Sequence, residues 1–218
     1  IAREKAGIIK RGVPVVLAPQ QEDARQVVHQ VAKDMGSPLI EVGRDLTFAG
    51  LDATLDGQSF VITKGSGESE EKLSLRIPLL GEYQVENAAT AYAALQTLRE
   101  VGFPISDNDI RVGFGNTVWP ARFEIARRDP PVIFDAAHNP AAMEKLRQTV
   151  DQYFADVPMV LVFGISEDKN LVGMFEQLLP RTEILICTQA THPRAMDADL
   201  MLQKAAGFPC EKKVVYDV

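Results

Sequence analysis

A carboxylate and an imidazole stand three residues apart in the segment Asp135-Ala136-Ala137-His138-Asn139-Pro140, which follows the apolar run 131–134. We expect Asp135 to end a strand. Asn139 and Pro140 favour a helix start, because Asn caps helices and Pro suits the first helical position. Open α/β sheets bind ligands at such strand-to-helix crossings. The segment therefore predicts either a ligand site or an ordinary helix cap beside a surface histidine.

The second half of the chain alternates between strand and helix patterns around this segment. Strands are expected at 123–126, 132–135, 159–165, 183–187 and 213–216, and helices at 140–155, 171–179 and 197–206. Such alternation is typical of a mostly parallel sheet. We therefore expect an incomplete doubly wound α/β domain here.

The first half begins with a β-α-β rhythm and continues with short β-prone pieces. The rhythm comes from a strand at 13–17, a helix at 22–35 and a strand at 39–42, which favours parallel pairing. The pieces at 46–48, 53–55, 60–63 and 73–77 predict a small antiparallel insert with an exposed charged loop at 64–71. A long helix from about Glu82 or Val85 to Glu100 follows, and then a short helix that opens on a capping box, Ser106 to Asp109. Glycines after it place a domain junction between Gly115 and Ala121.

Composition narrows the class of protein. The 218 residues are 46% hydrophobic and 24% charged, as in an ordinary globular protein. The net charge of -7 disfavours broad nucleic-acid binding, and no apolar run approaches the roughly 20 residues that cross a bilayer. Cys187 and Cys210 lack metal-ligand spacing and form no disulfide framework, which fits a reducing cytoplasm. The first residue is Ile and no signal-peptide core follows it, so we expect the chain to start inside a larger protein.

Four short motifs stand in a defined order along the chain: Glu4-Lys5-Ala6-Gly7-Ile8, Asn87-Ala88-Ala89-Thr90-Ala91, Trp119-Pro120-Ala121-Arg122-Phe123-Glu124 and Phe134-Asp135-Ala136-Ala137-His138-Asn139-Pro140. In this order they resemble folylpolyglutamate synthase/dihydrofolate synthase, a family of ATP-dependent amide ligases related to the Mur ligases of cell-wall synthesis. The resemblance spans nearly the whole chain. It departs at Ala121, where the family often has Gly, and it keeps Arg122.

The resemblance implies an α/β chain that is the C-terminal portion of such a ligase. Residues 1–118 would be the end of a P-loop-type ATPase domain with a small β insert. Residues 119–218 would be a mostly parallel, Rossmann-like C-terminal Mur ligase domain, truncated at its end. No G-x-x-x-x-G-K-[ST] motif occurs in the sequence, so we expect this chain to be inactive alone.

The implied reaction is ATP-driven attachment of L-glutamate to dihydropteroate or to a folate through an acyl phosphate, with Mg²⁺. The expected partners are these small molecules, with no nucleic acid and no membrane, and the parent protein would be a cytoplasmic monomer. Two alternatives stay open. One is a Mur-type ligase that uses a peptidoglycan precursor, and the other is a non-catalytic nucleotide-binding domain.

The chemistry of phosphoryl transfer assigns roles to the residues around the central segment. Arg122 has a planar guanidinium that can hold phosphate oxygens, although an ion pair with Glu124 or Asp129 is the alternative. Asp135 resembles the family's ATP-contacting carboxylate. His138 would face the same ligand and donate to a nucleotide or phosphate.

Further residues match the family's motifs elsewhere. Asn87 opens, or lies in the first turn of, the long helix and matches a nucleotide-contacting Asn. The lysine equivalent to Lys5 is often carbamylated in the family, a form that can help hold magnesium, whereas an unmodified Lys5 would pair with Glu4 or a phosphate.

Two segments of the second half match the family less fully. Asp168 and Lys169 lie in a segment that resembles one of the family's own and could orient glutamate, with a capped helix start as the alternative. Arg194 would meet a glutamate carboxylate. His29 is expected at the surface.

Overall fold

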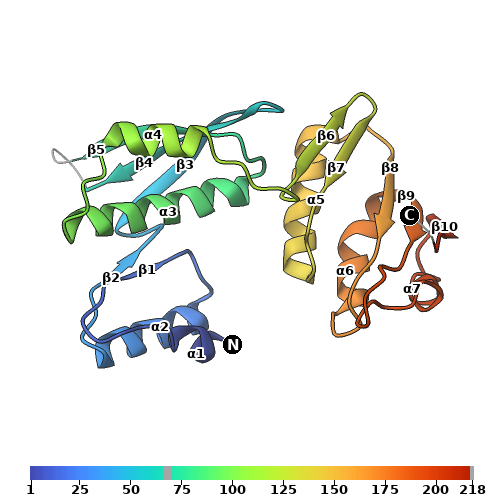
Figure 1. Ribbon diagram of the computed structural model, residues 1–218, viewed down its shortest axis with the longest axis horizontal. Coiled ribbons are helices and arrows are strands. Elements are labelled where there is room, and N and C mark those ends of the chain that lie inside the picture. Colours follow the sequence, from blue (N-terminus) through green and yellow to red (C-terminus); the bar gives the residue numbers. More distant parts are fainter. Residues whose placement is uncertain (66–69, 217–218) are drawn as a thin grey trace. The chain divides into compact units, whose positions relative to one another are not determined.

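The computed structural model describes residues 1–65 and 70–216. The chain forms two compact units, Ile1–Trp119 and Pro120–Val218 (Figure 1). Their boundary falls within the expected interval 115–121, one residue beyond the division at 118/119. Residues 66–69, in the charged loop expected at 64–71, lie outside the described residues. The assignment of the first unit to an ATPase domain stays a prediction.

The first unit opens with a β-α-β arrangement, as the sequence predicts. It contains α1 (Ala2–Ala6), β1 (Val15–Leu17), α2 (Glu22–Asp34) and β2 (Leu39–Glu41). β1 and β2 pair in parallel, with Val15 opposite Leu39. These two residues pack with α2, whereas Val16 and Ile40 pack into the neighbouring core cluster. Both faces of the small sheet are therefore covered.

A three-stranded antiparallel sheet follows, which confirms the predicted insert. Its order is β3 (Leu46–Thr54), β4 (Gly57–Lys64) and β5 (Glu71–Ile77). The pieces expected at 46–48 and 53–55 are one strand, and the separation was wrong. The register of β3 shifts between Gly50 and Ala53, so the strand bends without ending.

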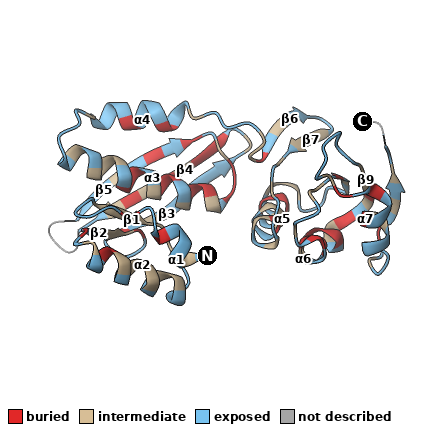
Figure 2. Cartoon of the chain, turned by 60° about the horizontal axis from the view of Figure 1, so that its bottom comes forward, coloured by how far each residue is buried: buried red, intermediate tan, exposed pale blue. Residues whose placement is uncertain are grey.

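Two helices complete the first unit and bury its core. α3 (Glu82–Glu100) and α4 (Asp107–Gly115) contact the three-stranded sheet. The central strand β4 carries many of the buried residues, including Phe60 (Figure 2). The capping box of α4 is confirmed, because Ser106 Oγ accepts the Asp109 N–H at 3.1 Å and the Asp109 carboxylate accepts the Ser106 N–H at 2.7 Å. The Ser106 hydroxyl, which donates to the Asp109 carboxylate at 2.6 Å, and then the Ser106 N–H lower the pKa of Asp109.

Within residues 1–65 and 70–216, no helix combines the length and the apolar character that a membrane span requires.

The second unit is an α/β unit with a parallel sheet, which confirms the predicted fold class. Its sheet has the order β10 (Glu211–Val214), β9 (Thr182–Cys187) and β8 (Met159–Phe163), with all three strands parallel. β6 (Glu124–Arg128) and β7 (Pro131–Phe134) form a separate antiparallel hairpin. A link of two residues, 129 and 130, is too short for a parallel crossover and makes these strands neighbours.

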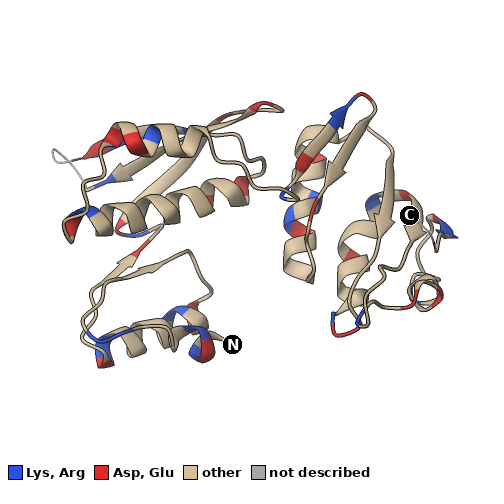
Figure 3. Cartoon of the chain, in the orientation of Figure 1, with Lys and Arg blue, Asp and Glu red and all other residues tan. Residues whose placement is uncertain are grey.

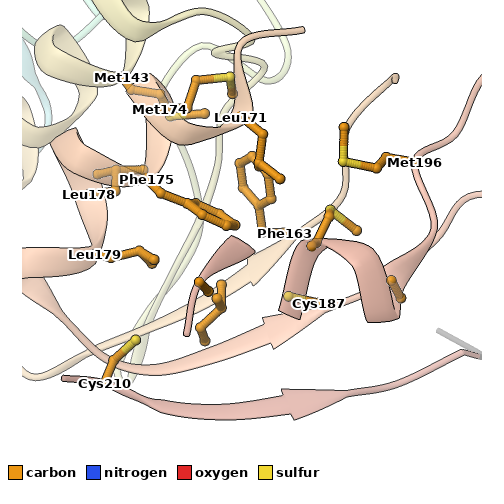
Figure 4. Packing of buried hydrophobic residues seen from close by; sticks show 14 residues of the cluster. Met143, Phe163, Leu171, Met174, Phe175, Leu178, Leu179, Cys187, Met196 and Cys210 are labelled. Atoms are coloured by element: carbon orange, nitrogen blue, oxygen red, sulfur yellow. The ribbon is translucent and has the colours of Figure 1, made fainter. Parts of the chain in front are cut away.

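The core of the second unit lies between this sheet and the helices α5 (Pro140–Phe154), α6 (Leu171–Leu178) and α7 (Ala198–Lys204) (Figure 4). Phe175 of α6 is 1% exposed, and its ring centroid lies 5.4 Å from that of Phe163 and 6.3 Å from that of Phe208. On β8 the alternate residues Val160 and Val162 are 54% and 55% exposed. The cluster therefore covers one face of the sheet.

Both cysteines of the chain belong to this core cluster. Cys187 and Cys210 are free, buried thiols, in line with the expectation of no disulfide framework. Burial raises the pKa of Cys187 to about 11, so the thiol stays protonated and unreactive near neutral pH.

Candidate functional site

The segment between β7 and α5 is a capped strand-to-helix crossing. β7 ends at Phe134, and the Asn139 side chain accepts the N–H of Ala142 at 2.9 Å, with Pro140 at the first helical position. The predicted helix cap is confirmed. Asp135 is half-buried at the end of the strand, and His138 is exposed just before the cap.

Asp135 hydrogen-bonds through both carboxylate oxygens to the chain's own backbone. Oδ2 accepts the N–H of Phe123 at 2.8 Å, and Oδ1 accepts the N–H of Ala137 at 2.7 Å. The first contact joins residues twelve positions apart. It holds the start of β6 next to the end of β7. Because Arg122 directly precedes Phe123, the backbone of Arg122 lies near Asp135.

His138 contacts its own segment through one ring nitrogen. Nδ1 lies 3.0 Å from the carbonyl oxygen of Ala136. Because a carbonyl oxygen only accepts, this contact assigns the proton to Nδ1, and a neutral ring then leaves Nε2 as an acceptor. Only the doubly protonated imidazolium can donate through Nε2 to a phosphate.

Arg122 occupies a turn with an unusual backbone. Its neighbours Ala121 and Phe123 have φ values of 55° and 48°, in the left-handed region that residues with a Cβ rarely adopt. This geometry explains why glycine suits position 121. Glu124, one of the expected ion-pair partners of Arg122, accepts the Ala121 N–H through Oε2 at 2.9 Å.

The loops that follow β8 and β9 meet at the carboxyl edge of the parallel sheet. Glu167 donates its N–H to the Arg194 carbonyl at 2.9 Å, and Ser166 forms an antiparallel bridge with Ala195. Lys169 Nζ lies 2.8 Å from Asp168 Oδ2. The hydrogen bond from Lys169 lowers the pKa of the Asp168 carboxyl, and the charge of Arg194 lowers it further. Burial acts in the opposite direction and is outweighed. The structure thus gathers Asp168, Lys169 and Arg194.

The helix start beside these loops is also capped. Asn170 accepts the N–H of Gly173 at 3.1 Å at the beginning of α6. The alternative of a capped helix start therefore applies to Asn170, whereas Asp168 and Lys169 precede the cap and keep their side chains at the sheet edge.

Asn87 lies in the second turn of α3, and the expectation that it opens the helix or lies in its first turn was wrong. The helix begins five residues earlier, at Glu82. Asn87 is exposed, and its Nδ2 donates to Oε1 of the buried Gln84 at 3.1 Å. Gln84 therefore orients Asn87, and the residue pattern gave no signal for this pair.

A second buried glutamine fixes the approach to α3. Gln58 on β4 is 3% exposed, and its Nε2 donates to the carbonyl oxygens of Leu79 and Gly81, each at 2.8 Å. Gln58 lies outside the strand piece expected at 60–63, and no sequence pattern indicated this role, because the carbonyl partners lie more than twenty residues away.

Lys5 lies on the exposed side of α1, next to the buried Ala6. Among residues 1–65 and 70–216, no three His, Cys, Asp or Glu side chains gather in a way that could hold a metal ion. Carbamylation of Lys5 stays a prediction.

An ion-pair cluster joins α2 to β2. His29 Nε2 lies 2.6 Å from Glu41 Oε1, and Arg25 contacts both oxygens of the same carboxylate. The hydrogen bond from Arg25 is the first cause that lowers the pKa of Glu41. His29, expected simply at the surface, thus has a defined partner. Elsewhere, positively and negatively charged residues are scattered along both units (Figure 3).

Residues 121–217, nearly all of the second unit, match the family model described as Mur ligase, glutamate ligase domain. The second unit therefore belongs to the glutamate ligase domains of the Mur ligases. The chain as a whole is homologous to the C-terminal portion of folylpolyglutamate synthase/dihydrofolate synthase.

The relatives cover both units. The dihydrofolate synthase/folylpolyglutamate synthase of Bacillus subtilis is 34% identical over 89% of this chain and 45% of its own length, and that of Escherichia coli is 30% identical over 93% and 44%. A solved folylpolyglutamate synthase of Mycobacterium tuberculosis complexed with ADP is 28% identical, with a TM-score of 0.86. That of Thermotoga maritima is 32% identical, with a TM-score of 0.79. These two structures match 99% of this chain, which spans 48% and 50% of theirs, about half their length.

Proposed function

We propose that this chain is the C-terminal portion of an ATP-dependent ligase that attaches L-glutamate to dihydropteroate, to folates, or to both. The observation that carries the proposal is the fixed turn that presents Arg122 beside the strand-to-helix crossing of a glutamate ligase domain. A folylpolyglutamate synthase that matches 99% of the chain was solved with ADP, which supports a nucleotide as the ligand.

The reaction proceeds in two balanced steps. The substrate carboxylate takes the γ-phosphoryl group of ATP, which gives an acyl phosphate and ADP. The amine of L-glutamate then attacks the acyl carbon, the amide C–N bond forms as the C–O bond to the phosphate breaks, and inorganic phosphate and one amine proton are released. In the first step, a protein can supply positive charge around the transferred phosphoryl group and can hold the reactants in fixed positions.

In this proposal some residues of the second unit bind ATP, and others bind L-glutamate. Arg122 holds phosphate oxygens in a bidentate manner, and a doubly protonated His138 donates through Nε2. Asp168, Lys169 and Arg194 orient glutamate at the sheet edge, where cationic groups can pair with its carboxylates. In the first unit, Asn87 offers its amide to the nucleotide, with Gln84 holding it in place.

Magnesium would neutralise charge on the phosphates when it is bound. The donor set described above contains no cluster of three ligands, and Mg²⁺ commonly uses one or two carboxylates together with phosphates and water. A carbamylated Lys5 would fit as one such oxygen ligand.

Ligation of radiolabelled L-glutamate by the full-length protein tests the proposal. With ATP and magnesium, glutamate should be attached to dihydropteroate or to a folate, and not to a nucleotide-linked muramyl substrate. Turnover of the muramyl substrate would support the Mur-type alternative. No turnover of either, with ATP still bound, would support a non-catalytic nucleotide-binding domain. The 218-residue chain should not turn over alone, because it contains no P-loop sequence.

Replacement of Arg122 tests its place in the nucleotide site. In the full-length protein, Arg122→Ala should weaken ATP binding about 10- to 100-fold, because it removes one bidentate charge-assisted contact. Titration calorimetry measures the affinity.

Arg147→Ala is the matched control, since Arg147 belongs to the same unit and makes a half-exposed ion pair with Asp151 on α5. It should leave the affinity unchanged. Equal ATP affinity in the Arg122→Ala variant and the unaltered protein would contradict the assigned role.

A further inference from the structure

We propose that Asp135 is a positioning residue, whose carboxylate holds the backbone turn that presents Arg122. The structural part of this inference stands on the geometry of the second unit. Its consequence for nucleotide binding rests on the proposed function, because it requires that Arg122 contacts the ligand.

The turn needs a restraint because its backbone is strained. Ala121 and Phe123, on either side of Arg122, both lie in the left-handed region, with φ values of 55° and 48°. A residue with a Cβ pays a steric cost there, and a bulky residue such as Phe is a genuine outlier. Without external contacts the turn would relax, and the direction of the Arg122 side chain would change.

Three hydrogen bonds supply the restraint. The Phe123 N–H donates to Asp135 Oδ2 at 2.8 Å, and the Ala121 N–H donates to Glu124 Oε2 at 2.9 Å. The Ala136 N–H donates to the Ala121 carbonyl oxygen at 3.0 Å. Two of the three acceptors are carboxylates, and charge-assisted hydrogen bonds are the stronger kind.

The side chain of Phe123 anchors the same turn from the other side. It is 2% exposed, and its ring centroid lies 6.1 Å from that of Tyr153 and 6.4 Å from that of Phe154, both on α5. The ring holds Phe123 in place, and Asp135 fixes the direction of its N–H. Together they define the backbone on the carboxyl side of Arg122.

The second oxygen of Asp135 extends the restraint to His138. Oδ1 accepts the N–H of Ala137 at 2.7 Å, immediately before His138. One carboxylate thus joins the Arg122 turn to the His138 segment. The backbone segments that carry Arg122 and His138 are thus set before a ligand arrives, and such preorganisation lowers the ordering cost of binding. An amide could not replace the carboxylate, because its NH₂ group would face one of the two N–H donors.

Amide hydrogen exchange of the full-length protein, read by mass spectrometry on peptides over 119–124 and 135–139, tests the restraint without any ligand. Asp135→Ala should speed exchange at Phe123 and Ala137 about tenfold or more, which is the worth of a hydrogen bond to a charged acceptor. Asp135→Asn, which keeps one acceptor, should speed exchange at one of the two amides only. Asp156→Ala, at an exposed site of the same unit, should change neither. Unchanged exchange in both Asp135 variants would overturn the inference.

A double-mutant cycle separates positioning from direct contact with the nucleotide. Glycine adopts positive φ without a Cβ penalty, so Ala121→Gly should relieve part of the strain that Asp135 opposes. If Asp135 positions Arg122, the loss of ATP affinity caused by Asp135→Ala should shrink, from about tenfold to about threefold, in the Ala121→Gly background. Equal losses in both backgrounds would show a direct contact and overturn the positioning role. If the unaltered protein does not bind ATP, the proposed function fails, and the exchange experiment still decides the restraint.

Discussion

Phe175→Ala is expected to lower the free energy of unfolding of the second unit by about 3–5 kcal/mol. Phe175 is 1% exposed and makes a tilted ring contact with Phe163 and an edge-on ring contact with Phe208 in the core cluster. Truncation removes the buried ring and both ring contacts, and it leaves a cavity that the strands and α6 can fill only in part. Effects of this size exceed those of ordinary surface substitutions several-fold.

Val172→Ala is the matched control for Phe175→Ala. Val172 lies on the same helix but is 46% exposed, so its truncation should cost less than about 1 kcal/mol. Urea denaturation followed by circular dichroism measures both variants, and hydrogen exchange in peptides of α6 assigns the transition to the second unit. A loss of under about 1.5 kcal/mol for Phe175→Ala would contradict the central packing of this ring.

Gly57→Ala is expected to destabilise the first unit by about 3 kcal/mol or more. Gly57 has φ 126°, which side chains rarely adopt, and a Cβ would lie 2.5 Å from the carbonyl oxygen of Ile77 and 3.0 Å from Cα of Pro78. Both neighbours are backbone atoms, so no rotamer change can relieve the clash. Strand β4 would have to move away from β5, together with Gln58, which holds the approach to α3.

Gly102→Ala isolates the backbone cost from the clash. Gly102 also has positive φ, 99°, but a Cβ there would meet no atom within 4 Å. This variant should therefore lose only about 1–2 kcal/mol. The same urea titration, with exchange in peptides of β4 to identify the unit, compares the two. If the two variants lost the same free energy of unfolding, the close approach of Gly57 to Ile77 would make no contribution to stability.

The sequence by itself determined the features that depend on near neighbours along the chain. Helical spacing of apolar residues predicted α2, α3 and α5, because this period follows from helix geometry. Short apolar or β-prone runs between turn residues predicted the strands. The caps at Ser106 and Asn139 were also predicted, since a cap joins groups only three residues apart. The order of four motifs identified the related family correctly.

The tertiary structure alone decided which distant groups meet. The bond from Phe123 to Asp135 spans twelve residues, and Gln58 reaches carbonyls twenty-one and twenty-three residues away. No local periodicity encodes such pairs. For the same reason, the left-handed backbone on either side of Arg122 and the second-turn position of Asn87 emerged only in the fold. The segment 135–140 showed from sequence alone that a carboxylate stands at a helix start. Its hydrogen bonds to the Arg122 turn depend on long-range contacts, because only the packed hairpin and α5 hold Phe123 within reach of Asp135.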